Sequence, residues 1–235
     1  ENLAARHGIS REACEAWSVV SQQRAAAAWA AGVFAPEVVP VMLRDRKTKQ
    51  DVAWARDEHI RGDVTIEALA KLPPVTRAGG TVTAGTASGI NDGAAMLVMT
   101  TDEIAAREGA TPIGRLISWG VMGVPPDVMG IGPVPAARQA LARAGMTIDQ
   151  MDLVEINEAF AAQYLAVAAE LALDPARTNV HGGAIAIGHP LGASGARITA
   201  HLLHALRARG GGIGLGAACI GGGQGIAVIV EGFGD

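Results

Sequence analysis

The chain has 235 residues, of which 49% are hydrophobic and 18% charged, and its formal net charge is −4 at pH 7. This composition excludes intrinsic disorder, which requires low hydrophobicity and high net charge, and it lacks the basic excess of a nucleic-acid-binding protein. No apolar run is long enough to cross a membrane, so we expect no membrane partner. The two cysteines cannot form a disulfide framework, and they indicate a reducing, cytoplasmic compartment.

The first part of the chain is predicted to begin with a long helix and then to lose regular structure. The helix is expected over residues 10–32, with Ser10 as its N-cap. Residues 36–42 contain two prolines and predict an edge strand. Residues 44–85 are rich in turn-forming residues, which predicts an irregular excursion with a short helix near 65–71.

A basic cluster, residues 44–49, lies at the start of this excursion. Charge runs usually face water, so one interpretation is a solvated turn between two elements. The other interpretation is a binding site for a phosphorylated ligand.

Strand-like and helix-like segments alternate in the rest of the chain. Strands are expected over 91–100, 112–119, 151–156, 212–219 and 225–231, and helices over 102–108, 135–144, 157–171 and 192–209. The alternation from residue 112 onward predicts an α/β fold with a covered central sheet. Because only a few residues separate the last two strands, we expect them to form an antiparallel hairpin within a mixed sheet.

Cys219 is the first candidate for chemistry, because a glycine run follows it from Gly221 to Gly223. Residues without a Cβ let backbone N–H groups approach a ligand and form an anion-binding nest. A thiol beside such a nest suits acyl chemistry, in which an oxyanion develops. The alternatives are a buried cysteine that only fills the core and a hairpin turn that only needs positive φ angles.

His189 is the second candidate, and it stands in Gly188-His189-Pro190. The proline disfavours helical geometry at His189, and the positive end of the following helix favours a neutral imidazole, which can act as a base. A structural histidine is the alternative. His201 and His204, three residues apart on that helix, could share a face as metal ligands or lie on a solvated surface, and we predict no metal.

Asn157 is the third candidate, because it stands between a predicted strand and a predicted helix. It could serve as an ordinary helix N-cap, or it could hold a water molecule or a carbonyl oxygen. From spacing alone, Cys219 and His189 suggest acyl transfer, and the N-cap interpretation of Asn157 stays open.

Three motifs occur in the order found in thiolases, and on these residues the chain resembles that family. They are Asn157-Glu158-Ala159-Phe160, Gly188-His189-Pro190 and Cys219-Ile220-Gly221-Gly222-Gly223. The segments at residues 80–94 and 128–133 support the resemblance, which covers the whole chain and is strongest to the acetyl-CoA acetyltransferase branch.

The resemblance implies a thiolase-like layered α/β fold with a mixed five-stranded sheet covered by helices. Residues 1–90 would form a partial, irregular coenzyme A-binding loop domain. Residues 91–111 would be the last strand and helix of the N-terminal domain, and residues 112–235 the C-terminal domain. The chain would then be the C-terminal portion of a thiolase that joins two acetyl-CoA molecules into acetoacetyl-CoA or cleaves 3-ketoacyl-CoA.

The resemblance also implies a role for each candidate residue. His189 would activate the acyl-accepting cysteine, Cys219 would move the proton at the acetyl α-carbon, Asn157 would hold an oxyanion-hole water, and the Gly221 N–H would serve a second oxyanion hole. Coenzyme A thioesters would be substrates, with no tightly bound cofactor. Their contacts would come from Arg61, Leu72, Ala84, Ser88, Met129 and Phe160. Relatives of this kind form dimers or tetramers, so we expect a homo-oligomer.

The chain departs from the family pattern in one important respect, which is that the acyl-accepting cysteine has no counterpart in it. Cys14 lies in a predicted helix without a glycine-rich context, so it cannot replace that cysteine. We therefore expect a fragment that is inactive alone. Two alternatives are a non-catalytic acyl-CoA-binding or interaction module and a relative of the ketoacyl carrier-protein synthases, whose usual site residues fit this chain less well. At Val75-Thr76 the family often has an aromatic residue, which places adenine affinity in question.

Overall fold

The computed structural model describes residues 1–234, and a four-stranded mixed sheet lies at its centre. The strand order is β3 (Gly114–Gly123), β6 (Gln224–Phe233), β5 (Gly211–Ile220) and β4 (Leu153–Ile156). β4 runs parallel to β5, and the other two neighbouring pairs are antiparallel. The predicted C-terminal hairpin is confirmed as β5–β6, whereas the expected fifth strand is wrong, since the described residues supply four to this sheet.

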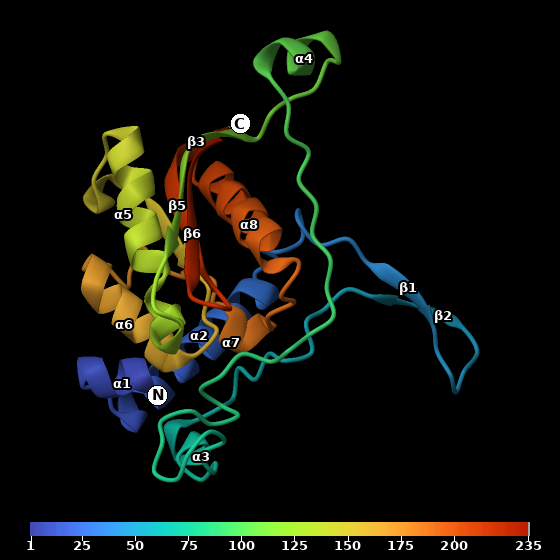
Figure 1. Cartoon of the computed structure of the whole chain (residues 1–235). Helices are drawn as coiled ribbons and strands as arrows, with labels where there is room; N and C mark the ends of the chain where they lie inside the picture. The colour runs from blue at the N-terminus through green and yellow to red at the C-terminus, as the bar shows by residue number, and fades with distance from the viewer. Residues whose placement is uncertain (235) are drawn as a thin grey trace.

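Helices cover both faces of the sheet, as Figure 1 shows with the sheet seen nearly edge-on. α5 (Pro133–Ala144) packs against β3 and β6 on one face, and α8 (Ser194–Ala208) packs against β5 and β6 on the other. α6 (Ala161–Leu171) lies beside α5. The predicted α/β class, with a covered central sheet, is confirmed.

Glycines in β5 let α8 approach the sheet closely. A Cβ atom on Gly214 would lie 2.8 Å from side-chain atoms of Leu202, and one on Gly216 would lie 2.9 Å from Ile198. Leu202 and Leu206 are fully buried in this layer. Because only 3% of the residues are aromatic, the close packing of this core rests on aliphatic side chains that fit over glycine.

The N-terminal helices dock onto the same core. α1 (Asn2–His7) and α2 (Arg11–Ala30) contact α6, and α2 also contacts α7 (Ala184–Ile187). The Ser10 hydroxyl accepts a hydrogen bond from the Ala13 N–H at 3.2 Å, so the predicted N-cap is confirmed. Trp17 of α2 stacks on Tyr164 of α6 with ring centroids 4.0 Å apart, which joins the first part of the chain to the second.

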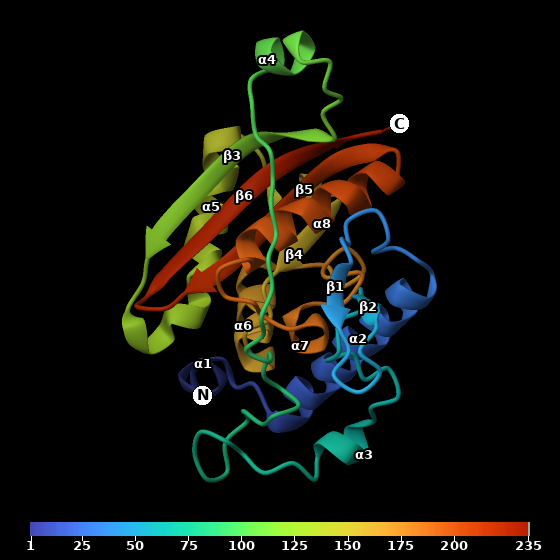
Figure 2. The ribbon, with the colours of Figure 1, turned by 90° about the vertical axis from the view of Figure 1, so that its right-hand side faces the viewer.

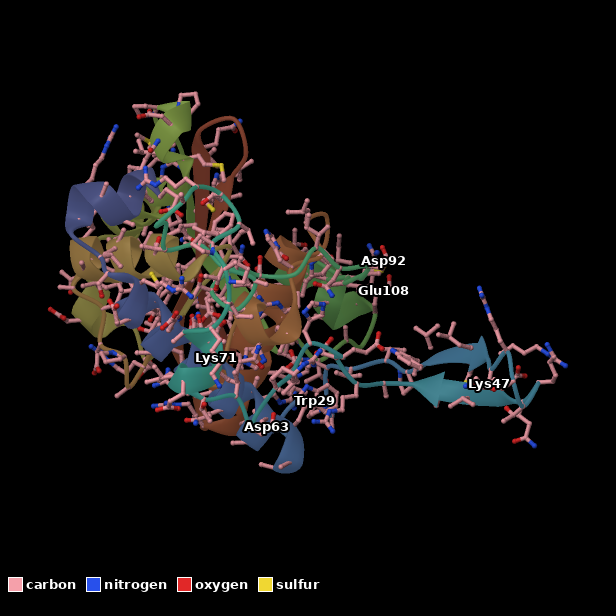
Figure 3. All side chains as sticks on the ribbon, turned by 90° about the horizontal axis from the view of Figure 1, so that it is seen from below. Trp29, Lys47, Asp63, Lys71, Asp92 and Glu108 are labelled. Atoms are coloured by element: carbon pink, nitrogen blue, oxygen red, sulfur yellow. The ribbon has the colours of Figure 1, made fainter. Side chains whose placement is uncertain are left out.

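The excursion after α2 is more regular than expected. β1 (Val41–Arg44) and β2 (Asp51–Trp54) form an antiparallel hairpin that projects from the body, with Lys47 at its tip in Figure 3. The edge strand predicted over 36–42 is wrong in its start, because residues 36–38 still belong to the turn that follows α2. The basic cluster is an exposed turn, as the solvated interpretation predicted, and α3 (Ile66–Leu69) is the expected short helix.

The strand expected over residues 91–100 is absent. Figure 2 shows this segment as an extended green run that climbs to α4 (Asp102–Arg107). Met96 and Val98 are 87% and 91% exposed. A strand needs a hydrogen-bonded neighbour, and within residues 1–234 no segment pairs with this run. The predicted helix that follows is present, and the Thr101 hydroxyl caps it.

The remaining elements are present with shifted ends. α5 begins at Pro133, before the expected Pro135, and it ends where Gly145 adopts the left-handed conformation. Short 3-10 helices, η1 (Pro126–Ile131) and η2 (Ile148–Gln150), flank α5. α6 begins at Ala161 with Phe160 in the N-cap position, so the N-cap interpretation of Asn157 is wrong.

Candidate active site

The candidate site lies where β4 and β5 end. Asn157 follows β4 directly, and its N–H donates to the Ala217 carbonyl of β5 at 2.9 Å. Cys219 is the second-last residue of β5, and Gly221 opens the turn after it. Because β4 and β5 are parallel, their carboxyl ends meet at one edge of the sheet, where ligands of open α/β folds commonly bind.

Residues 86–91 connect the loop that carries Asn157 to the loop that carries His189. The Ser88 N–H donates to the Ala159 carbonyl at 3.0 Å, in the loop after Asn157. The His189 N–H donates to the Gly89 carbonyl at 3.0 Å. One extended segment therefore holds the Asn157 loop on one side and the His189 loop on the other.

The imidazole of His189 is held between two side chains. Its Nδ1 lies 2.6 Å from Ser194 Oγ, and its Nε2 lies 3.2 Å from Asn157 Nδ2. An amide NH₂ group can only donate, so Nε2 accepts from Asn157 and the ring proton lies on Nδ1. The Ser194 hydroxyl then accepts from Nδ1–H and donates to the Pro190 carbonyl at 3.0 Å.

His189 is also kept neutral. Burial lowers its pKa, and the nearby Arg197 cation lowers it further. A neutral imidazole with an unprotonated Nε2 can take a proton from a thiol, and when protonated it can donate a hydrogen bond to an oxyanion. The lowered pKa and the Nδ1–H tautomer are both compatible with the predicted role of His189 as a neutral base.

Asn157 presents an unused acceptor. Its side chain is buried, and its Oδ1 has no hydrogen-bond partner among the described residues. A buried polar atom without a partner is costly, and such an atom at a site is suited to an O–H or N–H of a bound molecule. This supports the interpretation of Asn157 as a site residue.

Cys219 and Gly221 lie at the same end of the sheet without a hydrogen bond to Asn157 or His189 within residues 1–234. Burial raises the pKa of the Cys219 thiol to about 11, so it is protonated at neutral pH. Gly222 and Gly223 have φ angles of 86° and 96°, which only glycine adopts readily, and this fixes the shape of the turn. The exposed Gly221 backbone is free to face a ligand.

The expected coenzyme A contacts fall into three groups. Ser88 and Phe160 lie together beside the site, because residues 86–88 pair with residues 159–161. Met129 is half-buried in η1. Leu72 and Ala84 follow α3 along the chain. Arg61 precedes α3 and is exposed, and its guanidinium donates to the Glu58 carbonyl at 2.6 Å.

The structure adds three residues that sequence reasoning missed. Ser194 orients His189, Asn91 accepts from the His189 N–H at 3.3 Å, and Glu158 is fully buried under the Asn157 loop. Glu158 gave a signal in the sequence, since a carboxylate between apolar residues and next to Asn157 needs buried donors. Ser194 gave a weaker signal as the first residue of a helix just after His189.

The other singled-out residues play no part in this arrangement. Cys14 is fully buried, and burial raises its pKa to about 11, so it is not an accessible nucleophile. His201 is 3% exposed and bonds to Glu37 and His181, which makes the solvated interpretation wrong for His201.

No cluster of three or more metal-ligating side chains occurs in the described part of the chain. None of the helices that the structure describes has the length and apolar character needed to span a membrane.

Both parts of the chain match thiolase family models. The model for the thiolase N-terminal domain matches residues 1–103, and that for the thiolase C-terminal domain matches residues 110–232. The chain therefore belongs to the thiolase family. The expectation that it is a C-terminal portion is too narrow, because residues 1–103 match the N-terminal model.

Individual relatives and solved structures agree with this assignment. Over 231 residues the chain is 54% identical to the mitochondrial 3-ketoacyl-CoA thiolase of Homo sapiens and 51% identical to an acetyl-CoA acetyltransferase of Escherichia coli (strain K12). Each alignment covers 98% of this chain and 58% of the relative, so the chain spans less than two thirds of these proteins.

Two crystal structures share the fold. Human mitochondrial 3-ketoacyl-CoA thiolase aligns with a TM-score of 0.92 at 50% identity, over 98% of this chain and 58% of that one. The Bacillus anthracis acetyl-CoA acetyltransferase aligns with a TM-score of 0.95 at 44% identity, over 99% of this chain and 58% of that one. The layered thiolase fold is thus confirmed.

Proposed function

We propose that the protein transfers acyl groups between coenzyme A thioesters, either by joining two acetyl-CoA molecules or by cleaving 3-ketoacyl-CoA with coenzyme A. The observation that carries the proposal is the contact between Asn157 and His189 at the edge of the sheet where β5, the strand of Cys219, also ends. The names of relatives at 51% and 54% identity supply the substrate class.

Each site residue has a role in this reaction. His189 takes the proton of the acyl-accepting thiol, and the thiolate then attacks the thioester carbonyl, which releases coenzyme A as its thiol. In cleavage, the Cys219 thiol donates its proton to the α-carbon of the acetyl-CoA enolate, and in condensation the Cys219 thiolate takes that proton back to form the enolate. Asn157, through a water molecule, and the Gly221 N–H hold the developing oxyanions. Ser88, Phe160, Met129, Leu72, Ala84 and Arg61 bind the coenzyme.

The acyl-accepting thiol is assigned to a part of the enzyme other than these 235 residues. Cys14 is fully buried with a raised pKa, and Cys219 is engaged as the acid and base. We propose that the enzyme works as a homo-oligomer in the cytoplasm. The absence of an accessible thiolate favours a second function for this chain alone, which is binding acyl-CoA without turnover.

Calorimetry and an activity assay separate these functions. Titration of acetyl-CoA into the chain should give saturable binding that Ser88→Trp weakens, and acetoacetyl-CoA with coenzyme A should not be cleaved by the chain alone. Cleavage by the full-length protein that His189→Ala abolishes would support the acyltransferase. No binding by either protein would overturn the proposal.

A further inference from the structure

Glu158 lies at the centre of a buried network beneath the site. Its side chain is fully buried. Its Oε1 accepts hydrogen bonds from Trp17 Nε1 at 3.1 Å and Asn179 Nδ2 at 2.8 Å. Its Oε2 accepts from Ser21 Oγ at 2.7 Å and the Ile185 N–H at 3.2 Å. Four donors therefore converge on one carboxylate. Two of them come from α2, and the other two come from Asn179 and the Ile185 backbone.

Gly183 leaves open the space that the Glu158 carboxylate occupies. A Cβ atom on Gly183 would lie 2.4 Å from Glu158 Cδ, which is far inside van der Waals contact. The Gly183 N–H donates to Ser21 Oγ at 3.0 Å, so the same serine binds both groups. The carboxylate thus fixes the start of α7, which is one turn long.

Both catalytic loops begin at this network. Asn157 is the neighbour of Glu158 along the chain, and α7 ends at Ile187, two residues before His189. Gly188 cannot carry a side chain without touching Asn91, because its Cβ would lie 2.5 Å from Asn91 Oδ1, so the link from α7 to His189 is tight. A displacement of Glu158 would therefore act on the loops that carry both side chains.

We propose that Glu158 is the positioning residue that holds Asn157 and His189 at contact distance. The inference deepens the proposed function, because it concerns the same site. Trp17 and Ser21 anchor the buried Glu158 carboxylate to α2, and this one carboxylate supports both catalytic loops.

The test uses Glu158→Gln and the nitrogen resonances of His189. Glutamine keeps the shape but turns an NH₂ group toward two of the four donors, so the network must open. In the wild-type chain, long-range ¹⁵N–¹H spectra should show one tautomer, with the proton on Nδ1. In the variant we expect a mixture of tautomers and a changed pH midpoint for His189.

A matched control distinguishes positioning from a general structural effect. Glu15 is a buried carboxylate on α2 that pairs with Arg11 at 2.7 Å and lies outside the network. Glu15→Gln should leave the His189 tautomer unchanged, even where urea unfolding shows lost stability. An unchanged His189 spectrum in Glu158→Gln, or an equal change in both variants, would overturn the proposal.

A second variant covers the case in which Glu158→Gln does not fold. Trp17→Phe removes one donor and keeps a ring to stack on Tyr164. It should move the His189 resonances in the same direction by a smaller amount, and a wild-type spectrum would overturn the proposal. In the full-length protein, Glu158→Gln should lower kcat about 10- to 100-fold with little change in KM, because misplacement of the catalytic groups slows chemistry. The spectra need no turnover, so a failure of the proposed function does not alter their outcome.

Discussion

Nε2 of His189 lies 3.2 Å from Nδ2 of Asn157, and the lone pair of the imidazole faces the amide. Because an amide NH₂ group can only donate, the ring proton lies on Nδ1, where Ser194 Oγ accepts a hydrogen bond from it. The contact leaves Asn157 Oδ1 without a partner among residues 1–234. One histidine and one asparagine, 32 positions apart, thus place an imidazole lone pair and an unpaired amide oxygen close together, which is the basis of the proposed function.

Ser194→Ala should loosen the tautomer of His189. Without the hydroxyl acceptor, the Nδ1 proton loses its partner and the two tautomers become closer in energy. We expect a mixed population in ¹⁵N spectra, and a fall of about 10- to 100-fold in kcat of the full-length protein, which is less than the loss of about 10²- to 10⁴-fold expected when a general acid or base is removed altogether. Thr199→Val is the control, because Thr199 makes a similar bond to its own helix, at Gly195. A single Nδ1–H tautomer in Ser194→Ala would contradict this account.

His189→Ala and Cys219→Ser should affect different steps in the full-length protein. The first removes the base that activates the acyl-accepting thiol, so formation of the acyl-enzyme should slow. The second removes the acid and base at the α-carbon, so condensation should fall while some acylation survives. Rapid-quench measurement of bound acyl groups separates the steps. Equal loss of both steps in both variants would refute the assigned roles.

Gly183→Ala should destabilise the chain through Glu158. The new Cβ would lie 2.4 Å from the carboxylate carbon, and four hydrogen bonds prevent that group from moving aside. We expect a loss of about 1–3 kcal/mol in the free energy of unfolding, measured with urea. Gly192→Ala is the matched control, since nothing lies within 4 Å of its Cβ position, and it should change stability by less than about 0.5 kcal/mol. Similar losses in both variants would disprove this steric explanation.

His181 should make the fold less stable in mild acid. Burial and, to a smaller extent, the neighbouring His201 lower its pKa to about 4. Because the unfolded chain then binds more protons between pH 4 and 6.5, this contribution is present above pH 6.5 and is lost as the pH falls toward 4. With allowance for solvent screening, the free energy of unfolding should fall by about 1–2 kcal/mol between pH 7 and pH 5. Urea unfolding of His181→Gln should show a smaller loss over this range, and an equal loss would exclude His181 as the cause.

Local signals predicted much of the fold. The Ser10 and Thr101 caps and the stop at Gly145 were readable because each acts within a few residues. The glycine run from Gly221 to Gly223 marked one loop of the site. The prediction of a strand over residues 91–100 was wrong, because an apolar run does not by itself supply the neighbouring strand that a sheet requires.

The site could be predicted only in part. His189, Asn157 and Cys219 carry the chemistry and stand in readable motifs. The hydrogen-bond partners of Glu158 could not be predicted, because they are remote in sequence: Trp17 is 141 positions away and Ser21 is 137 positions away. Spacing along the chain carries no information about such pairs.

The central claim is that Asn157, His189 and Cys219 form the acyl-transfer site of a thiolase whose acyl-accepting thiol lies outside these residues. Acetoacetyl-CoA cleavage, followed by the acetyl-CoA formed, tests it most directly. The full-length protein should turn over, its His189→Ala and Cys219→Ser variants should lose nearly all activity, and residues 1–235 alone should give none. Full activity in either variant, or turnover by residues 1–235 alone, would contradict the claim.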